Sequence, residues 1–126
     1  MRKTQEIREA VAADIDALAT FNVYDYNKVN IADEDLPAVT TTIAGGSYES
    51  GAEDCTLNLR IEIKAKGVKV ENILDDYAEL IEPLFPVGHT LNGLVEYMLP
   101  ESFDYAFDSD SSTGTMGLNF NVKYEV

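Results

Sequence analysis

The longest regular pattern in the sequence is a run from Cys55 to Lys66 in which apolar and polar side chains alternate. Successive side chains of a β-strand point to opposite faces of its sheet, so this period of two predicts one long strand. Its apolar members are Cys55, Leu57, Leu59, Ile61, Ile63 and Ala65. They are expected to face a core while the other face meets water, and Gly67 is expected to end the strand.

Two helices and four further strands are predicted around this strand. Apolar residues recur at helical spacing over residues 4–18 and again over residues 70–84. Thr4 is the predicted cap of the first helix, and Pro83 stands in the last turn of the second. The other strands are predicted at residues 22–27, 36–43, 95–107 and 116–126. This order predicts an α+β fold with a single mixed or antiparallel sheet of about five strands and two helices packed on one face.

Glycine and proline set the expected ends of two strands. Gly45-Gly46 is expected to break the strand at 36–43, and Pro100 to interrupt the strand at 95–107 because proline has no N–H to donate. Long polar loops rich in small residues are predicted at 44–54 and 108–114. Loops of this composition are suited to becoming ordered on contact with a partner.

The chain is strongly acidic. Its 126 residues carry 23 Asp and Glu against 9 Lys and Arg, a net charge of −14, which is equal in the two halves. A free-standing nucleic-acid-binding protein needs a basic footprint, so the charge argues against that class. The length predicts one domain over residues 1–126. We expect no membrane span and no signal peptide, because no apolar run is long enough, and a cytoplasmic protein is the default.

Few residues offer catalytic or metal-binding chemistry. One Cys and one His argue against a disulfide framework or a Cys-rich metal site. The segment 108–114 hints at a calcium loop, but Thr113 stands where a glycine is needed and Asn119 where a glutamate is needed. His89 lies in a predicted turn, and Cys55 is expected to be a small buried apolar residue. We therefore expect neither an enzyme nor a resident metal or cofactor.

Four of the nine positive charges lie within ten residues, namely Arg60, Lys64, Lys66 and Lys69. They form either a solvated strand face or a basic patch that docks on an acidic partner or a neighbouring copy. The polar face of the second predicted helix carries Glu71, Asp75 and Glu79. We predict that Arg60, Lys64 and Lys66 of one copy contact Glu71, Asp75 and Glu79 of the next. The alternative is that both faces are simply solvated.

An ordered series of short segments adds a resemblance to a known family. After the N-terminal helix come Asp33-Glu34-Asp35-Leu36-Pro37-Ala38-Val39, Ile43-Ala44-Gly45-Gly46-Ser47-Tyr48, the strand Leu57 to Ile63, Leu74-Asp75-Asp76-Tyr77 with Ile81-Glu82-Pro83, Phe103-Asp104-Tyr105 and Lys123-Tyr124-Glu125-Val126. In this order, over residues 4–126, the chain resembles the minor tail protein U family, the tail terminator proteins of lambda-like, long, non-contractile phage tails. It departs from the family pattern in having no Trp and in the turn at 85–90.

The resemblance implies a structural role in the virion tail, with assembly in the bacterial host cytoplasm. Family members form a hexameric ring that caps the head-proximal end of the tail tube, stops its polymerisation and forms the surface that joins the head. The implied partners are other copies of the chain, the major tail tube protein and a head-completion or connector protein. Candidate docking residues for the tube or head are Asp33, Glu34, Asp35, Ser47, Tyr48, Glu49, Asp108 and Asp110.

Two hypotheses follow from the acidity of such a ring. A negative lumen would repel phosphates, so DNA would pass through without specific binding. Dense charge between subunits would make assembly depend on Mg²⁺ or salt. Two alternative functions are kept: a head–tail connector or tail-completion protein of related fold, and a small monomeric binding module from a prophage or bacterial locus.

Overall fold

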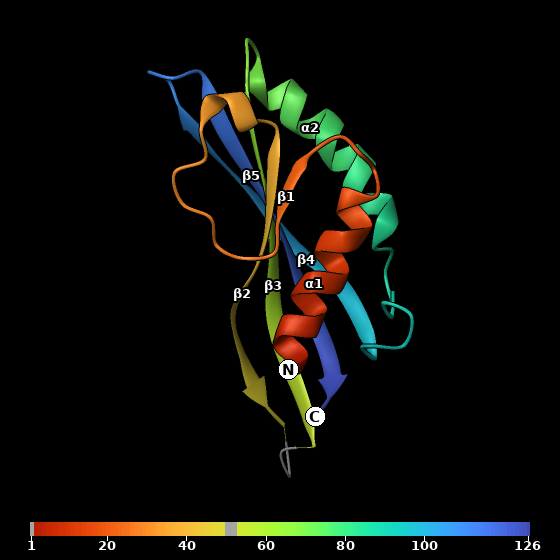
Figure 1. Cartoon of the computed structure of the whole chain (residues 1–126). Coiled ribbons are helices and arrows are strands. Elements are labelled where there is room, and N and C mark those ends of the chain that lie inside the picture. The colour runs from red at the N-terminus through yellow and green to blue at the C-terminus, as the bar shows by residue number, and fades with distance from the viewer. Residues whose placement is uncertain (1, 50–52) are drawn as a thin grey trace.

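The alternating strand lies at the centre of a five-stranded sheet that carries two helices on one face (Figure 1). The computed structural model describes residues 2–49 and 53–126. Its elements are α1 (Lys3–Asp16), β1 (Asn22–Tyr24), the 3-10 turn η1 (Asp33–Asp35), β2 (Ala38–Tyr48), β3 (Asp54–Lys66), α2 (Val70–Ile81), the 3-10 turn η3 (Glu82–Leu84), β4 (Tyr97–Asp108) and β5 (Thr113–Glu125). The strand order is β1-β2-β3-β5-β4, with β1 parallel to β2 and the other pairs antiparallel. The predicted α+β fold is confirmed.

The centre of the core is one face of β3. This strand pairs with β2 on one side and with β5 on the other over almost its whole length. Leu57, Leu59, Ile61 and Ile63 are each at most 1% exposed, and each such burial contributes about 1.5–3 kcal/mol. The helices cover this face with Ile7, Val11 and Ile15 of α1 and with Leu74, Ala78 and Ile81 of α2. The polar residues of β3 therefore lie on the face of the sheet opposite the helices, called the open face below.

The helix ends differ slightly from those predicted. Arg2 occupies the N-cap position of α1 and no side chain caps the helix, so the predicted cap by Thr4 is wrong. Thr4 lies within the first helical turn instead. The α-helical part of the second helix ends at Ile81, and η3 tightens the chain around Pro83, whose ring lacks the N–H that an α-helix needs.

The glycine pair does not end its strand. β2 continues to Tyr48, and its register against β3 shifts between Ile43 and Gly45, which marks a bulge. A Cβ atom on Gly46 would lie 2.8 Å from the carbonyl oxygen of Thr56, so this close approach requires glycine. The predicted loop at 44–54 is therefore shortened, and its residues 50–52 lie outside the described residues.

Pro100 does not interrupt its strand either. β4 runs from Tyr97 to Asp108, and a second register shift, between Pro100 and Ser102, absorbs the proline. Proline is tolerated there because β4 is at the edge of the sheet, where one row of backbone groups has no partner strand. At the other edge, β1 is shorter than predicted and covers β2 only from Ala38 to Thr40. None of the described helices is long and apolar enough to cross a membrane.

Truncation of the central strand tests this account of the core. Ile61→Ala removes a fully buried side chain and is expected to lower the free energy of unfolding by about 2–5 kcal/mol. Val68→Ala, at a position that is 89% exposed, is the matched control and is expected to change it by less than about 0.5 kcal/mol. Urea denaturation followed by circular dichroism measures both. Equal losses would contradict the central place of β3.

Candidate functional site

An ion network around Arg60 lies on the open face. The Arg60 guanidinium binds Asp104 of β4 through two hydrogen bonds of 2.7 and 2.8 Å, and its Nε donates to Glu62 at 3.1 Å. The guanidinium crosses over β5 to reach β4, and Gly117 of β5 leaves room for it. A Cβ atom on Gly117 would lie only 2.1 Å from Arg60 Nη1. The hydrogen bond from Arg60 lowers the pKa of Asp104 below its ordinary value.

Two lysines are also paired with carboxylates of the same chain. Lys66 Nζ lies 2.7 Å from Asp33 Oδ2 of η1, and this hydrogen bond lowers the pKa of Asp33. Lys123 Nζ lies 3.3 Å from Glu49 Oε2, and this contact raises the pKa of Lys123. Two of the three predicted interface cations, Arg60 and Lys66, therefore have carboxylate partners in their own chain. Within residues 2–49 and 53–126, Lys64 has none within 4.0 Å.

The predicted acidic surface lies on the other side of the molecule. Glu71, Asp75 and Glu79 are exposed on α2, and the sheet separates them from the cations of β3. The two sets do not meet within one chain, and their contact between copies stays a prediction. Asp75 instead accepts a hydrogen bond from the Tyr105 hydroxyl, which raises the pKa of Tyr105 to about 12.

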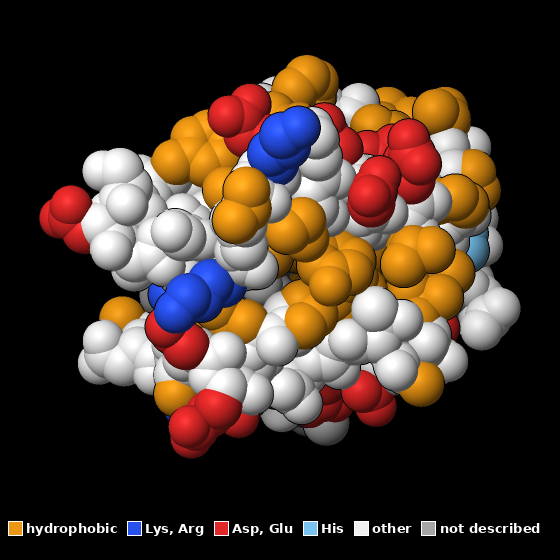
Figure 2. All heavy atoms as spheres, turned by 90° about the horizontal axis from the view of Figure 1, so that it is seen from above, with side chains coloured by type: hydrophobic (Ala, Val, Ile, Leu, Met, Phe, Trp, Pro, Cys, Tyr) orange, Lys and Arg blue, Asp and Glu red, His pale blue; other side chains and the backbone are white. Residues whose placement is uncertain are grey.

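The predicted docking residues lie at opposite ends of the sheet. Asp33, Glu34 and Asp35 form η1, next to the start of β2. Asp108 ends β4 and Asp110 lies in the β4–β5 turn at the same end. This first end is the upper one in Figure 1, and Figure 2 views it directly, with Lys, Arg, Asp and Glu side chains around an apolar area.

Ser47, Tyr48 and Glu49 lie at the second end, where β2 finishes and β3 begins. Tyr48 is 63% exposed there. Glu49 accepts a hydrogen bond of 2.9 Å from Thr56, the main cause of its lowered pKa. One group of predicted docking residues thus divides into two groups separated by the full length of the sheet.

Sequence reasoning did not find the aromatic surface on β4. Phe103, Tyr105 and Phe107 point to the helix-bearing side, yet they are 66%, 37% and 50% exposed. Their alternation is also the pattern of a buried strand face, so it does not indicate that these rings are exposed. Only the position of β4 beyond the cover of α2 leaves these rings in solvent.

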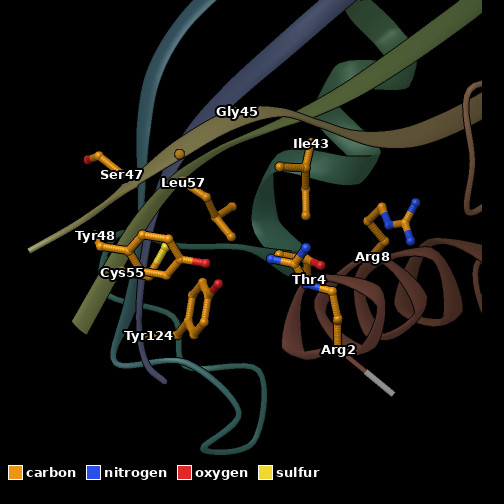
Figure 3. A pocket seen from close by; sticks show the side chains of 11 residues that line it. Arg2, Thr4, Arg8, Ile43, Gly45, Ser47, Tyr48, Cys55, Leu57 and Tyr124 are labelled. Carbon is orange, nitrogen blue, oxygen red and sulfur yellow. The ribbon is translucent and has the colours of Figure 1, made fainter. Parts of the chain in front are cut away.

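Two hollows flank the helix-bearing face of the sheet. The arginine hollow, about 370 Å³, lies between α1 and the last part of β2 and is defined by Arg2, Arg8, Ile43, Tyr48 and Tyr124. Figure 3 shows the arginines on one side of it and the two tyrosines on the other. The aromatic hollow, about 620 Å³, lies between η3 and β4 and is defined by Glu82, Phe85, Val87, Glu101, Phe103 and Phe120. Neither hollow is predicted by the sequence pattern.

Besides the two hollows, the described residues with reactive side chains are few. Among the described residues, no group of three or more His, Cys, Asp and Glu side chains is placed to hold a metal ion. Cys55 is buried, as predicted. The His89 ring packs edge-to-face against Phe85, with centroids 5.7 Å apart. The features left for function are therefore the two ends and two edges of the sheet.

Comparison with solved structures finds the same fold elsewhere. The chain resembles a solved structure described as "Virion of native gene transfer agent (GTA) particle", with a TM-score of 0.70, 14% identity and 94% of each chain covered. At this identity the likeness shows the fold. A comparison with curated proteins finds no significant match.

The family assignment comes from a family model. The model described as "Phage minor tail protein U" matches residues 2–124, nearly the whole chain. The protein therefore belongs to the phage minor tail protein U family, and the predicted resemblance is confirmed. Its role is that of a structural protein of phage tails.

The pairing of Arg60 with Asp104 predicts a pH-dependent contribution to stability. Because the pKa of Asp104 is lowered from 3.8 in the folded protein, the contribution is complete above that pH and is lost as the pH falls through the folded pKa. Asp104→Asn is expected to lower the free energy of unfolding by up to about 1 kcal/mol at pH 7 and by less at pH 3. Urea midpoints at both pH values measure this, with Asp76→Asn, an exposed acid of α2, as control. Equal losses at the two pH values would contradict the ion pair.

Proposed function

We propose that this protein is a tail terminator: a hexameric ring that caps the head-proximal end of the tail tube, stops its polymerisation and forms the head-joining surface. The observation that carries the proposal is the family match over residues 2–124. The geometry of the ends and edges of the sheet supports the finer assignments below.

The two ends of the sheet suit a ring that meets two different partners. The first end presents η1 and the β4–β5 turn, with acids beside Lys66, whereas the second end presents the close of β2 with exposed Tyr48. A ring of parallel copies would carry one set of loops toward the tube and the other toward the head. The proposed partners are the major tail tube protein and a head-completion or connector protein.

The edges of the sheet suit a cyclic assembly. The β4 edge and the β2 edge differ in side chains and in shape, so contact between them would be heterologous. Heterologous contacts generate a closed ring when the rotation between copies closes. A protein with one self-complementary surface would instead form a two-fold dimer.

The charge of the chain suits passage of DNA. Six copies of a chain with net charge −14 would surround the lumen with an excess of carboxylates, which repel phosphates. Mg²⁺ would assist ring assembly by screening the repulsion between acidic copies, and this effect needs no specific metal-binding site. The proposed location is the virion tail after assembly in the host cytoplasm, in line with the virion particle that shares this fold.

Mass measurement combined with a tube assay tests the proposed function. We expect size-exclusion chromatography with light scattering to give six times the 13.9 kDa protomer, and a shift toward six on addition of several millimolar Mg²⁺ or in the presence of tubes. Purified tube protein is also polymerised with and without this protein. In its presence, the tubes are expected to be shorter and to carry one ring at one end in electron micrographs.

Two outcomes favour the alternatives. Rings that bind the head side but leave tube length unchanged would favour a head–tail connector or tail-completion protein. A monomer under every condition, with no binding to tubes, would favour a small binding module. Bovine serum albumin at equal concentration controls for non-specific effects on polymerisation.

A further inference from the structure

The arginine hollow holds cations without carboxylate partners. Arg2 at the N-cap of α1 extends into it and Arg8 of α1 borders it (Figure 3), and neither has a carboxylate within 4.0 Å among residues 2–49 and 53–126. The Nε of Arg8 is buried and makes no hydrogen bond in that same part of the chain. Among the described residues, Arg60, Lys66 and Lys123 are the cations with a carboxylate within 4.0 Å. Arg2 and Arg8 differ from the other unpaired cations in that both line one hollow, whose described lining contains no Asp or Glu. An incoming carboxylate would form charge-assisted hydrogen bonds with the accessible guanidinium nitrogens of these arginines.

The aromatic hollow has the opposite character. Phe85 and Phe120 form its base, with ring centroids 6.2 Å apart, and Phe103 forms one wall. Phe103 is 66% exposed, so apolar surface remains unpaired at this edge. The charged residues of this hollow are two exposed acids, Glu82 of η3 and Glu101 of β4. An apolar surface with an acidic rim is complementary to one with a basic rim.

The two hollows lie at the same level of the sheet. In the strand registers, Ile43 pairs with Leu59, Leu59 with Phe120, and Phe120 with Pro100. Antiparallel hydrogen bonds run perpendicular to the strands, so one row crosses the sheet from Ile43 in the arginine hollow to Pro100 beside the aromatic hollow. If neighbouring copies are related by rotation about an axis parallel to the strands, all copies lie at the same height along that axis. The arginine hollow of one copy can then meet the aromatic hollow of the next.

The strands at the two ends of this row are bulged next to it: β4 at one edge, and the part of β2 beyond Thr40, which β1 does not cover, at the other. The register shifts fall between Ile43 and Gly45 in β2 and between Pro100 and Ser102 in β4. Bulges and edge prolines disfavour the addition of a further strand. A contact at these edges therefore depends on side chains rather than on a sheet that continues from copy to copy.

We propose that the arginine hollow of one copy receives the aromatic-hollow edge of the next copy, and that this is the subunit contact. In it, Arg2 and Arg8 face Glu82 and Glu101 of the neighbour, and the apolar side chains of both hollows are buried together. The proposal rests on the ring proposed above and assigns its interface. It differs from the predicted contact between the cations of β3 and the acids of α2.

A second copy fits the observations better than an unrelated protein. A ring needs two complementary surfaces on opposite edges of each copy and at one height, and the two hollows meet this requirement. An unrelated partner would account for one hollow and leave the other unexplained. Local attraction between the arginines and the acids also opposes the general repulsion between copies that each carry −14.

A mixing experiment tests the interface. Arg8→Glu places an acid opposite Glu101, and Glu101→Arg places a cation opposite Arg8, so each variant alone is expected to need about tenfold or more higher concentration for half-assembly. Mixed one to one, the two variants regain opposite charges at every contact if they alternate around a ring with an even number of copies. Light scattering and native mass spectrometry are expected to show rings with three copies of each variant.

The control is Lys64→Glu, which makes the same change of charge on the open face and also tests the predicted contact with α2. It is expected to assemble like the parent protein. Assembly of both single variants at the parent concentration would overturn the interface while leaving the ring intact, as would loss of assembly in Lys64→Glu alone. A mixture that fails to assemble while the parent forms rings would also overturn it. A parent protein that forms no ring, even with Mg²⁺ and tubes, would contradict the proposed function itself.

Discussion

The period-two pattern of β3 is the constraint on which the rest of the structure depends. Because β3 has a neighbour on each side, its backbone groups are satisfied along both edges, and only its two faces remain to be covered. One face is entirely apolar from Leu57 to Ile63, so both helices must pack there. The other face keeps its charged residues in solvent, where Arg60 links three strands through Asp104 and Asn119. The layered architecture and the open face thus share one origin.

The helices do not cover the whole sheet. α2 lies over β3 and β5, and α1 lies over β2 and β1, so β4 lies beside α2 rather than beneath it. Tyr105 of β4 still reaches Asp75 of α2, but Phe103 and Phe107 on either side of it stay exposed although they face the helix-bearing side. Apolar surface at an edge that is closed to strand addition is available for contact with another protein.

Sequence reasoning predicted what depends on local periodicity and missed what depends on register. The order of helices and strands follows from apolar spacing, and it was right. Gly45-Gly46 and Pro100 were wrongly expected to break strands, because hydrogen bonding to the neighbouring strand outweighs a local preference. Arg60 and Asp104 are 44 residues apart, and only the registers of β3, β5 and β4 bring them together. Both hollows likewise join segments far apart in the sequence.

Copies of a strongly acidic protein repel each other, so their contact depends on where the few cations lie. Arg60, Lys66 and Lys123 neutralise acids within the chain and hold strands and η1 together. A cation used in this way gives little attraction to a neighbour, since its charge is already compensated. Within residues 2–49 and 53–126, Arg2 and Arg8 beside the β2 edge and Lys64 on the open face have no carboxylate within 4.0 Å, so their charge is available to a neighbour. Lys64 is the one member of its predicted interface group left in this state, whereas Arg2 and Arg8 line one hollow together, which favours an interface at the edges of the sheet over one at its open face.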